Sequence, residues 1–135
     1  MVHRLIAILV CSAGLLGGCA SVTHVQAGHH DQFRNVLVQS CQSIQNGEFD
    51  LARNQLDRAR YLANGSQQQQ KVTDLEHMLD GGRFLNDGKP GKAASEWLAI
   101  RDAGLRKQVQ SLASSEGIDL IMLARNERMN EENAQ

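Results

Sequence analysis

The sequence predicts an all-α protein. From Gln32 onward, apolar and small residues recur at alternating steps of three and four, the spacing that places side chains on one face of an α-helix. Asn-Gly pairs at 46–47 and 64–65 and the polar segment 86–90 interrupt these stripes, and residues of this kind end helices. Nowhere does an alternating apolar and polar pattern run long enough to predict a strand.

Four apolar stripes define the main expected helices. They run from Phe33 to Ile44, from Phe49 to Ala63, from Val72 to Leu85 and from Ala93 to Ile100. Ser66 is a suitable N-cap for the third helix because its hydroxyl can accept a hydrogen bond from a first-turn amide. Pro90, the only proline, is suited to the start of the fourth, where a missing N–H matters least.

The C-terminal third predicts two shorter helices. Leu105, Val109 and Leu112 form one stripe, and residues 118–124 form the other before the polar end of the chain. The pair Ser114-Ser115, followed by Glu116, is expected to cap the last helix.

Size and composition limit the function. A chain of 135 residues builds one domain with one modest core. Aromatic residues make up only 4% of the chain, which leaves little for base-stacking platforms or aromatic cages, so the core must be mainly aliphatic. The net charge of -1 gives no reason to expect a nucleic acid partner.

The N-terminus has the pattern of an export signal. Arg4 precedes an uncharged apolar run from Leu5 to Leu16, which is too short to span a bilayer because a membrane-spanning helix needs about 20 residues. The run ends in Leu16-Gly17-Gly18-Cys19, which resembles the lipobox of bacterial lipoproteins. The resemblance implies cleavage between Gly18 and Cys19 and acylation of Cys19, a lasting membrane anchor. An ordinary secretory signal and an uncleaved anchor are the alternatives.

The expected domain organisation follows from that site. Residues 1–18 form the signal peptide, 19–31 a lipidated tether without an amphipathic period, 32–130 a helical repeat-like domain and 131–135 a polar tail. Ala20 follows the cysteine, where many lipoproteins retained on the inner membrane have aspartate. The resemblance therefore implies an anchor in the outer membrane, facing the periplasm.

The remaining cysteine and histidines predict neither a covalent staple nor a metal centre. With Cys11 in the signal and Cys19 acylated, Cys41 is expected to form no internal disulfide, and no basic group nearby in sequence would activate it. His24, His29, His30 and Asp31 are plausible metal ligands, but no downstream cluster would complete a coordination sphere. We therefore expect no cofactor.

Two helix pairs resemble each other. Counted from Gly47 and from Gly88, a small residue stands five positions on and a large one nine positions on. Both pairs resemble tetratricopeptide repeats, which implies stacked antiparallel hairpins with a C-terminal capping helix. In that pattern the small residue lets the two helices of a pair approach closely, and the large one fills the gap to the next pair. The matching residues are Gly47, Phe49, Ala52, Leu56, Ala59, Gly81, Phe84, Gly88, Ala93, Trp97 and Ile100.

The match is degenerate, and a plain helical bundle is the alternative. Ser43 is polar where the family has an aromatic residue, and the two glycines are 41 residues apart against a regular period of about 34.

No catalytic constellation is evident, because His77, Asp80 and Asp119 have no organised partners in the sequence pattern. We therefore expect a protein that is not an enzyme. The leading hypothesis is a lipid-anchored scaffold that binds another envelope protein or a secretion or assembly component. The long polar side chains expected on accessible faces are Arg53, Gln55, Arg58, Arg60 and Arg83.

Two alternatives share the same anchor. One is a pilotin-like chaperone that carries a secretin subunit to the outer membrane. The other is a structural envelope lipoprotein that self-associates and has no defined partner.

Overall fold

The computed structural model describes residues 24–134, with side chains described from Gly28 onward. Within this range the chain is all-α, which confirms the predicted fold class. The helices are α2 (His24–Gln45), α3 (Phe49–Leu62), α4 (Ser66–Asn86), α5 (Pro90–Ala99), α6 (Ala103–Ser115) and α7 (Leu120–Asn133). None of them has both the length and the hydrophobicity needed to span a bilayer.

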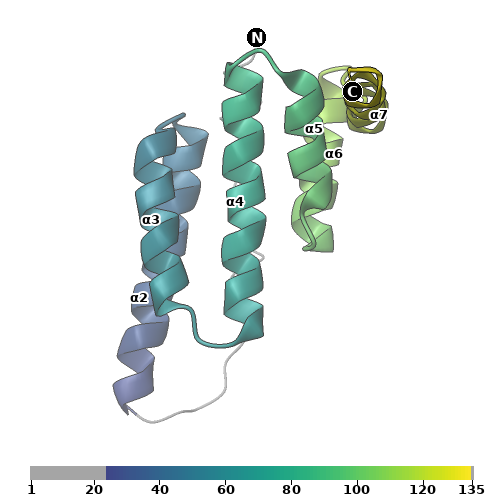
Figure 1. Ribbon diagram of the computed structural model, residues 1–135. Coiled ribbons are helices and arrows are strands. Elements are labelled where there is room, and N and C mark those ends of the chain that lie inside the picture. The colour runs from purple at the N-terminus through teal and green to yellow at the C-terminus, as the bar shows by residue number, and fades with distance from the viewer. Residues whose placement is uncertain (1–23, 135) are drawn as a thin grey trace.

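The helices pack as two antiparallel pairs followed by a third pair that is splayed (Figure 1). Helices α2 and α3 form the first pair, and helices α4 and α5 form the second. The first pair contacts the second because both α3 and α2 pack on α4. Helix α7 packs mainly on α5 and touches α6 only slightly. In Figure 1, α3, α4 and α5 lie side by side, and α7 is seen end-on because it crosses them steeply. The result is one helical array with an irregular C-terminal end.

One aliphatic core runs through the array, from Phe33 in α2 to Ala124 in α7. Leu37, Leu56 and Leu79 are its largest fully buried leucines, and all three come from the predicted stripes. Burying one such side chain stabilises the fold by about 2 kcal/mol. The predicted apolar faces are therefore the faces that hold the helices together.

Three turns between helices share one backbone geometry. Gly47, Gly88 and Gly117 have φ of 74°, 71° and 73°, a region that side chains other than hydrogen rarely adopt. After each glycine, the next amide donates to a carbonyl five residues earlier, at 2.9, 2.8 and 2.8 Å. This is the Schellman ending of a helix. Only the first two turns were predicted from the sequence.

Several predicted boundaries are wrong. Helix α2 begins at His24, so residues 24–31, expected as a tether, are helical, and α7 continues to Asn133 through most of the expected tail. Once a buried face nucleates a helix, adding polar residues at its end needs no further packing. Periodicity identifies the face that packs and therefore misses such extensions.

Two predicted caps are also wrong. Gly65 is the N-cap of α4, and Ser66, its first residue, makes no capping hydrogen bond. Ser114 and Ser115 end α6, where the Ser115 hydroxyl donates to the Leu112 carbonyl at 2.7 Å. The cap of the last helix is Asp119, whose carboxylate accepts from the Met122 amide at 3.0 Å.

Cys41 contradicts the expectation of a fold without a covalent staple. Its thiol is buried in α2 and is disulfide-bonded. The two other cysteines of the chain, Cys11 and Cys19, lie outside the described residues. The prediction failed because it assumed that the N-terminal cysteines were already removed or modified.

Candidate interaction surface

The predicted lipidation site, Gly18 and Cys19, lies outside the described residues. Of the histidine cluster that follows, His29, His30 and Asp31 are exposed on α2. Among residues with described positions, no group of three or more His, Cys, Asp or Glu side chains could hold a metal ion.

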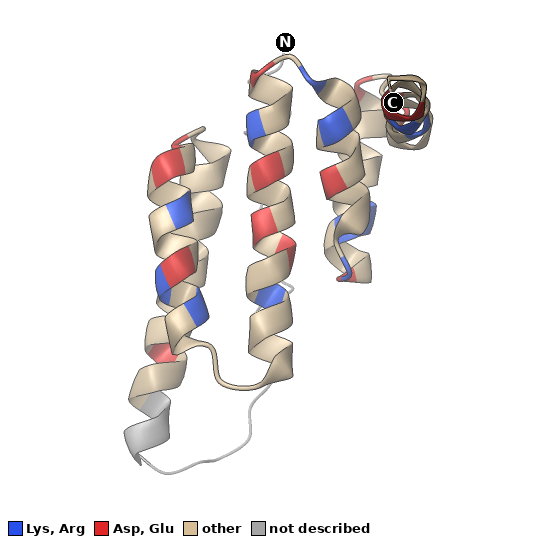
Figure 2. Cartoon of the chain, in the orientation of Figure 1, with Lys and Arg blue, Asp and Glu red and all other residues tan. Residues whose placement is uncertain are grey.

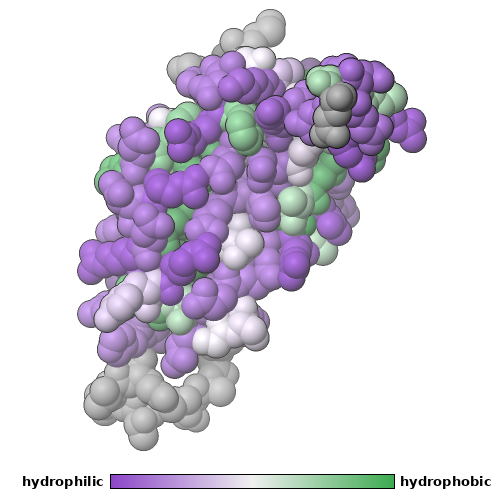
Figure 3. All heavy atoms as spheres, in the orientation of Figure 1, coloured by the Kyte–Doolittle hydropathy of each residue, from purple (hydrophilic) through white to green (hydrophobic). Residues whose placement is uncertain are grey.

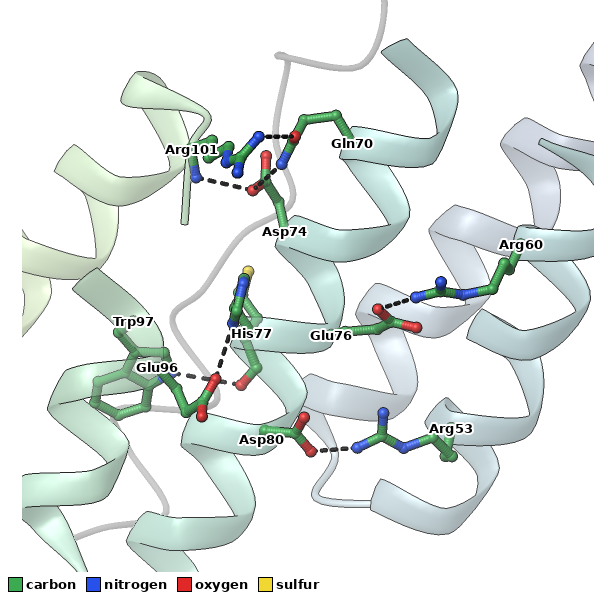
Figure 4. A network of polar contacts seen from close by, with 11 residues as sticks. Arg53, Arg60, Gln70, Asp74, Glu76, His77, Asp80, Glu96, Trp97 and Arg101 are labelled. Carbon is green, nitrogen blue, oxygen red and sulfur yellow. Dashed lines mark hydrogen bonds and ion pairs between the residues drawn. The ribbon is translucent and has the colours of Figure 1, made fainter. Parts of the chain in front are cut away.

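Helix α4 receives an aromatic ring from each neighbouring helix at two adjacent glycines. A Cβ atom on Gly81 would overlap the indole of Trp97, and one on Gly82 would lie 3.1 Å from the ring of Phe49. The Trp97 indole also donates to the Met78 carbonyl at 3.4 Å (Figure 4). Trp97 thus packs against the first helix of its own pair, whereas the repeat pattern placed the large residue toward the next pair. Phe49, by contrast, contacts α4 across the boundary between the two pairs.

The other predicted repeat positions are buried to different degrees. Phe84 and Phe49 are half-buried, and the turn residues Gly47 and Gly88 are exposed. The remaining residues have no exposed surface: Ala52, Leu56, Ala59, Ala93 and Ile100. Three of these five residues are alanine, whose short side chain takes up little space between packed helices.

A buried carboxylate fixes the link between α5 and α6. Asp74 on α4 is 3% exposed. Its two oxygens accept hydrogen bonds from the backbone amides of Arg101, at 2.8 Å, and Asp102, at 3.1 Å (Figure 4). The Gln70 side chain adds a third bond at 3.0 Å. No sequence pattern predicts this role, because the partners stand 27 and 28 residues away.

Ion pairs line the seam between α3 and α4, where charges of both signs alternate (Figure 2). Arg53 donates to Asp80 and Arg60 donates to Glu76. The hydrogen bond to Glu76, together with the charge of its carboxylate, raises the pKa of Arg60 above its ordinary value. Asp80 therefore has an organised partner, contrary to the sequence-based expectation. Exposed pairs of this kind stabilise a fold by about 1 kcal/mol or less.

Helices α4 and α5 are joined on the opposite side of α4. The Nδ1 atom of His77 lies 2.8 Å from a carboxylate oxygen of Glu96 (Figure 4). His77 thus lies at an interface between helices and, like Asp80, has an organised partner, contrary to the sequence-based expectation. Of the polar residues expected on accessible faces, Arg58 and Arg83 are exposed, whereas Gln55 is half-buried and its side-chain oxygen has no hydrogen-bond partner among the described residues.

Most of the surface in Figure 3 is hydrophilic, but α7 carries exposed apolar side chains. Ile121, Met122 and Met129 are 64%, 55% and 46% exposed. Met122 and Met129, seven residues apart, lie on the side of α7 opposite the buried Leu120 and Ala124, and Ile121 lies at the edge of that side. Together with Arg125, which lies between them, we name these residues the α7 stripe. It was not predicted from the sequence, because Ile121 and Met122 fall within the stripe 118–124 that was expected to pack.

Comparisons with protein-family models, curated proteins and solved structures found no match for this chain. The structural argument therefore rests on geometry: residues 24–134 form an all-α array in which Asp74 holds the link between α5 and α6 and α7 has exposed apolar side chains.

Proposed function

We propose that this protein is a membrane-anchored lipoprotein of the bacterial envelope that acts as a scaffold for protein–protein interaction. The observation that carries the anchor is Leu16-Gly17-Gly18-Cys19 at the end of a short uncharged run behind Arg4. Acyl chains add about 0.8 kcal/mol of membrane affinity for each buried methylene, so several chains on Cys19 anchor the protein permanently. Ala20 supports an outer-membrane address.

The binding role is supported by the described helices. They bury their apolar faces against one another and leave long helical surfaces accessible, and a helix can dock against such a surface. The scaffold would hold an envelope or secretion component close to the membrane.

The disulfide of Cys41 provides a readout of processing. Cleavage before Cys19 removes Cys11, and a thioether on Cys19 occupies that sulfur. A disulfide within the chain and the mature lipoprotein are therefore mutually exclusive. The proposal requires that the disulfide-bonded chain is the unprocessed form.

The experiment compares the precursor with Cys19→Ala in a bacterial host. For the wild type we expect a new N-terminus at Cys19, a lipid-sized mass increment and membrane fractionation. Cys19→Ala should have none of these. Mild crosslinking should then capture a specific envelope component only with the anchored protein. Identical behaviour of both proteins would rule out the lipoprotein proposal.

A further inference from the structure

We propose that one end of the helical array lies against the bilayer that holds the lipid anchor, with the ring of Tyr61 among the lipid headgroups. This end comprises residues 58–73, which are the last turns of α3, the turn at Gly65 and the first turns of α4. We name it the α3–α4 end. The inference rests on the proposed lipid anchor and gives the anchored protein an orientation, with the lipid surface as a second partner.

The chain between the anchor and the array is short. Cys19 stands five residues before His24, the first residue of α2, and five residues span at most about 18 Å whatever their conformation. Helix α2, with 22 residues, is itself about 33 Å long. An acyl chain on Cys19 therefore holds the start of α2 near the bilayer, while the far end of α2 has no such restraint.

The α3–α4 end lies at the same end of the array as the start of α2. Helices α2 and α3 are antiparallel, so α3 ends on the side where α2 begins, and Figure 1 shows both at the bottom of the array. Helix α2 has 22 residues and α3 has 14, so the first turns of α2 project beyond α3. Residues 28–32 are all exposed. A tilt of the array brings this projection and the α3–α4 end onto one plane.

Tyr61 supplies the contact that a bilayer favours. It is the only tyrosine of the chain, and its exposed fraction of 90% is the largest among the large apolar side chains of residues 28–134. A tyrosine ring is stable at the boundary between membrane and water, because its ring is apolar and its hydroxyl group is polar. The lipid headgroups would cover a ring that no helix of the array covers.

The charged residues of the α3–α4 end are all cations. They are Arg58, Arg60 and Lys71, and residues 58–73 contain no aspartate or glutamate. Arg58 is exposed, and the Arg60 side chain is 51% exposed. The turn residues 64–67 are exposed, polar and uncharged. Cations near a membrane surface are attracted to lipid phosphates, so this composition favours contact with headgroups.

Carboxylates border the α3–α4 end and reduce its positive charge. Asp57 on α3 and Asp31 on α2 are exposed, and Glu76 pairs with Arg60 (Figure 2). The net charge of this region is therefore only mildly positive. Anchoring and the Tyr61 ring should supply most of the contact, and anionic lipid should add to it modestly.

The opposite end of the array lacks this combination. At the turns that contain Gly47 and Gly88, the exposed charged residues are of both signs: Glu48, Asp87 and Lys89. No exposed aromatic ring accompanies them within residues 28–134, because Phe49 packs against α4 and Phe84 is half-buried. Of the two ends, the one nearer the anchor is the one suited to lipid.

The test places a tryptophan at either end of α3 in the full chain, purified from bacterial membranes and reconstituted in phospholipid vesicles whose phosphatidylcholine carries a nitroxide on its headgroup. One variant is Tyr61→Trp. The matched control is Asp50→Trp, eleven residues earlier on the same side of α3 and about 16 Å away along the helix. Both positions are exposed, so neither substitution disturbs the core. The wild type, with Trp97 alone, supplies the background fluorescence.

The nitroxide should quench the added fluorescence of Tyr61→Trp at least about twofold more than that of Asp50→Trp, because only the former lies at headgroup level. Adding Arg58→Glu to Tyr61→Trp should reduce the quenching in vesicles that contain phosphatidylglycerol. Arg83→Glu, at an exposed arginine near the other end of α4, should leave it unchanged.

Equal quenching at both positions would overturn the inference, because the array would then lie flat on the bilayer. Quenching at neither position would also overturn it, because the array would stand away from the bilayer. Intact mass of the same samples separates the inference from the anchor. With lipid on Cys19, either result refutes the orientation alone, whereas protein without lipid refutes the anchor and the orientation together.

Discussion

The first two helix pairs and the third end their leading helices in the same way but pack differently. The turns at Gly47, Gly88 and Gly117 have nearly equal φ and the same hydrogen bonds. After the first two, the following helix lies along its partner, whereas after the third, α7 leaves α6 and packs on α5. The comparison teaches that the turn is a local property of glycine, while the direction of the next helix depends on which face is apolar.

Disrupting the close approach of α4 and α5 should have the largest effect on stability. Gly81→Val places branched carbons where the Trp97 indole lies and should lower the free energy of unfolding by about 3 kcal/mol or more, because neither the helix backbone nor the buried ring can move freely. Urea unfolding measures the change. Gly28→Ala, at an uncrowded helical glycine, is the control and should stabilise by about 1 kcal/mol. Equal effects of both substitutions would refute this packing.

Removing the Asp74 carboxylate should have the next largest effect. Asp74→Ala leaves the part-buried amides of Arg101 and Asp102 without their acceptor, at a cost of about 1–3 kcal/mol. Hydrogen exchange should show faster exchange at those two amides. Asp57→Ala, an exposed carboxylate on α3, should change stability by about 0.5 kcal/mol at most. Unchanged protection of the two amides in Asp74→Ala would show that the carboxylate does not hold the link.

Substitutions in the three turns test whether the shared turn geometry depends on glycine. Replacing Gly47, Gly88 or Gly117 with alanine, one at a time, should cost about 1 kcal/mol at each position, because positive φ strains any side chain. Thermal unfolding compares the three variants. If the Gly117 variant alone were neutral, the shared turn would not be a property of the glycine.

Removing an ion pair from the seam between α3 and α4 should have the smallest effect on stability. A double-mutant cycle of Arg60→Ala and Glu76→Ala should give a coupling free energy below about 1 kcal/mol, because half of the Arg60 side chain is exposed to solvent. High salt should reduce it further. A coupling of several kcal/mol would mean that the pair is shielded from water.

Periodicity in the sequence was enough to predict the all-α class and the faces around Leu37, Leu56 and Leu79. It also placed Gly47 and Gly88 in turns, because Asn-Gly and Asp-Gly stand where a stripe stops. These features are local, so neighbouring residues determine them.

The remaining features depend on residues that are distant in the chain. Asp74 accepts hydrogen bonds from backbone amides 27 and 28 residues away. The absence of a side chain at Gly82 makes room for the ring of Phe49, which packs against it. Ile121, Met122 and Met129 are residue types that also occur in the core, and they differ only in what lies opposite them. No spacing within α7 distinguishes Met122 from a core methionine such as Met78.

The most direct test of the splayed third pair is the rate of methionine oxidation by dilute peroxide, followed by peptide mass spectrometry of the full chain. Met122 and Met129, at 55% and 46% exposure, should oxidise at the rate of solvent-exposed methionine, while Met78, at 2%, should be protected until the protein unfolds. Protection of Met122 and Met129 equal to that of Met78 would contradict the account, because α7 would then bury the face that the splayed third pair leaves exposed.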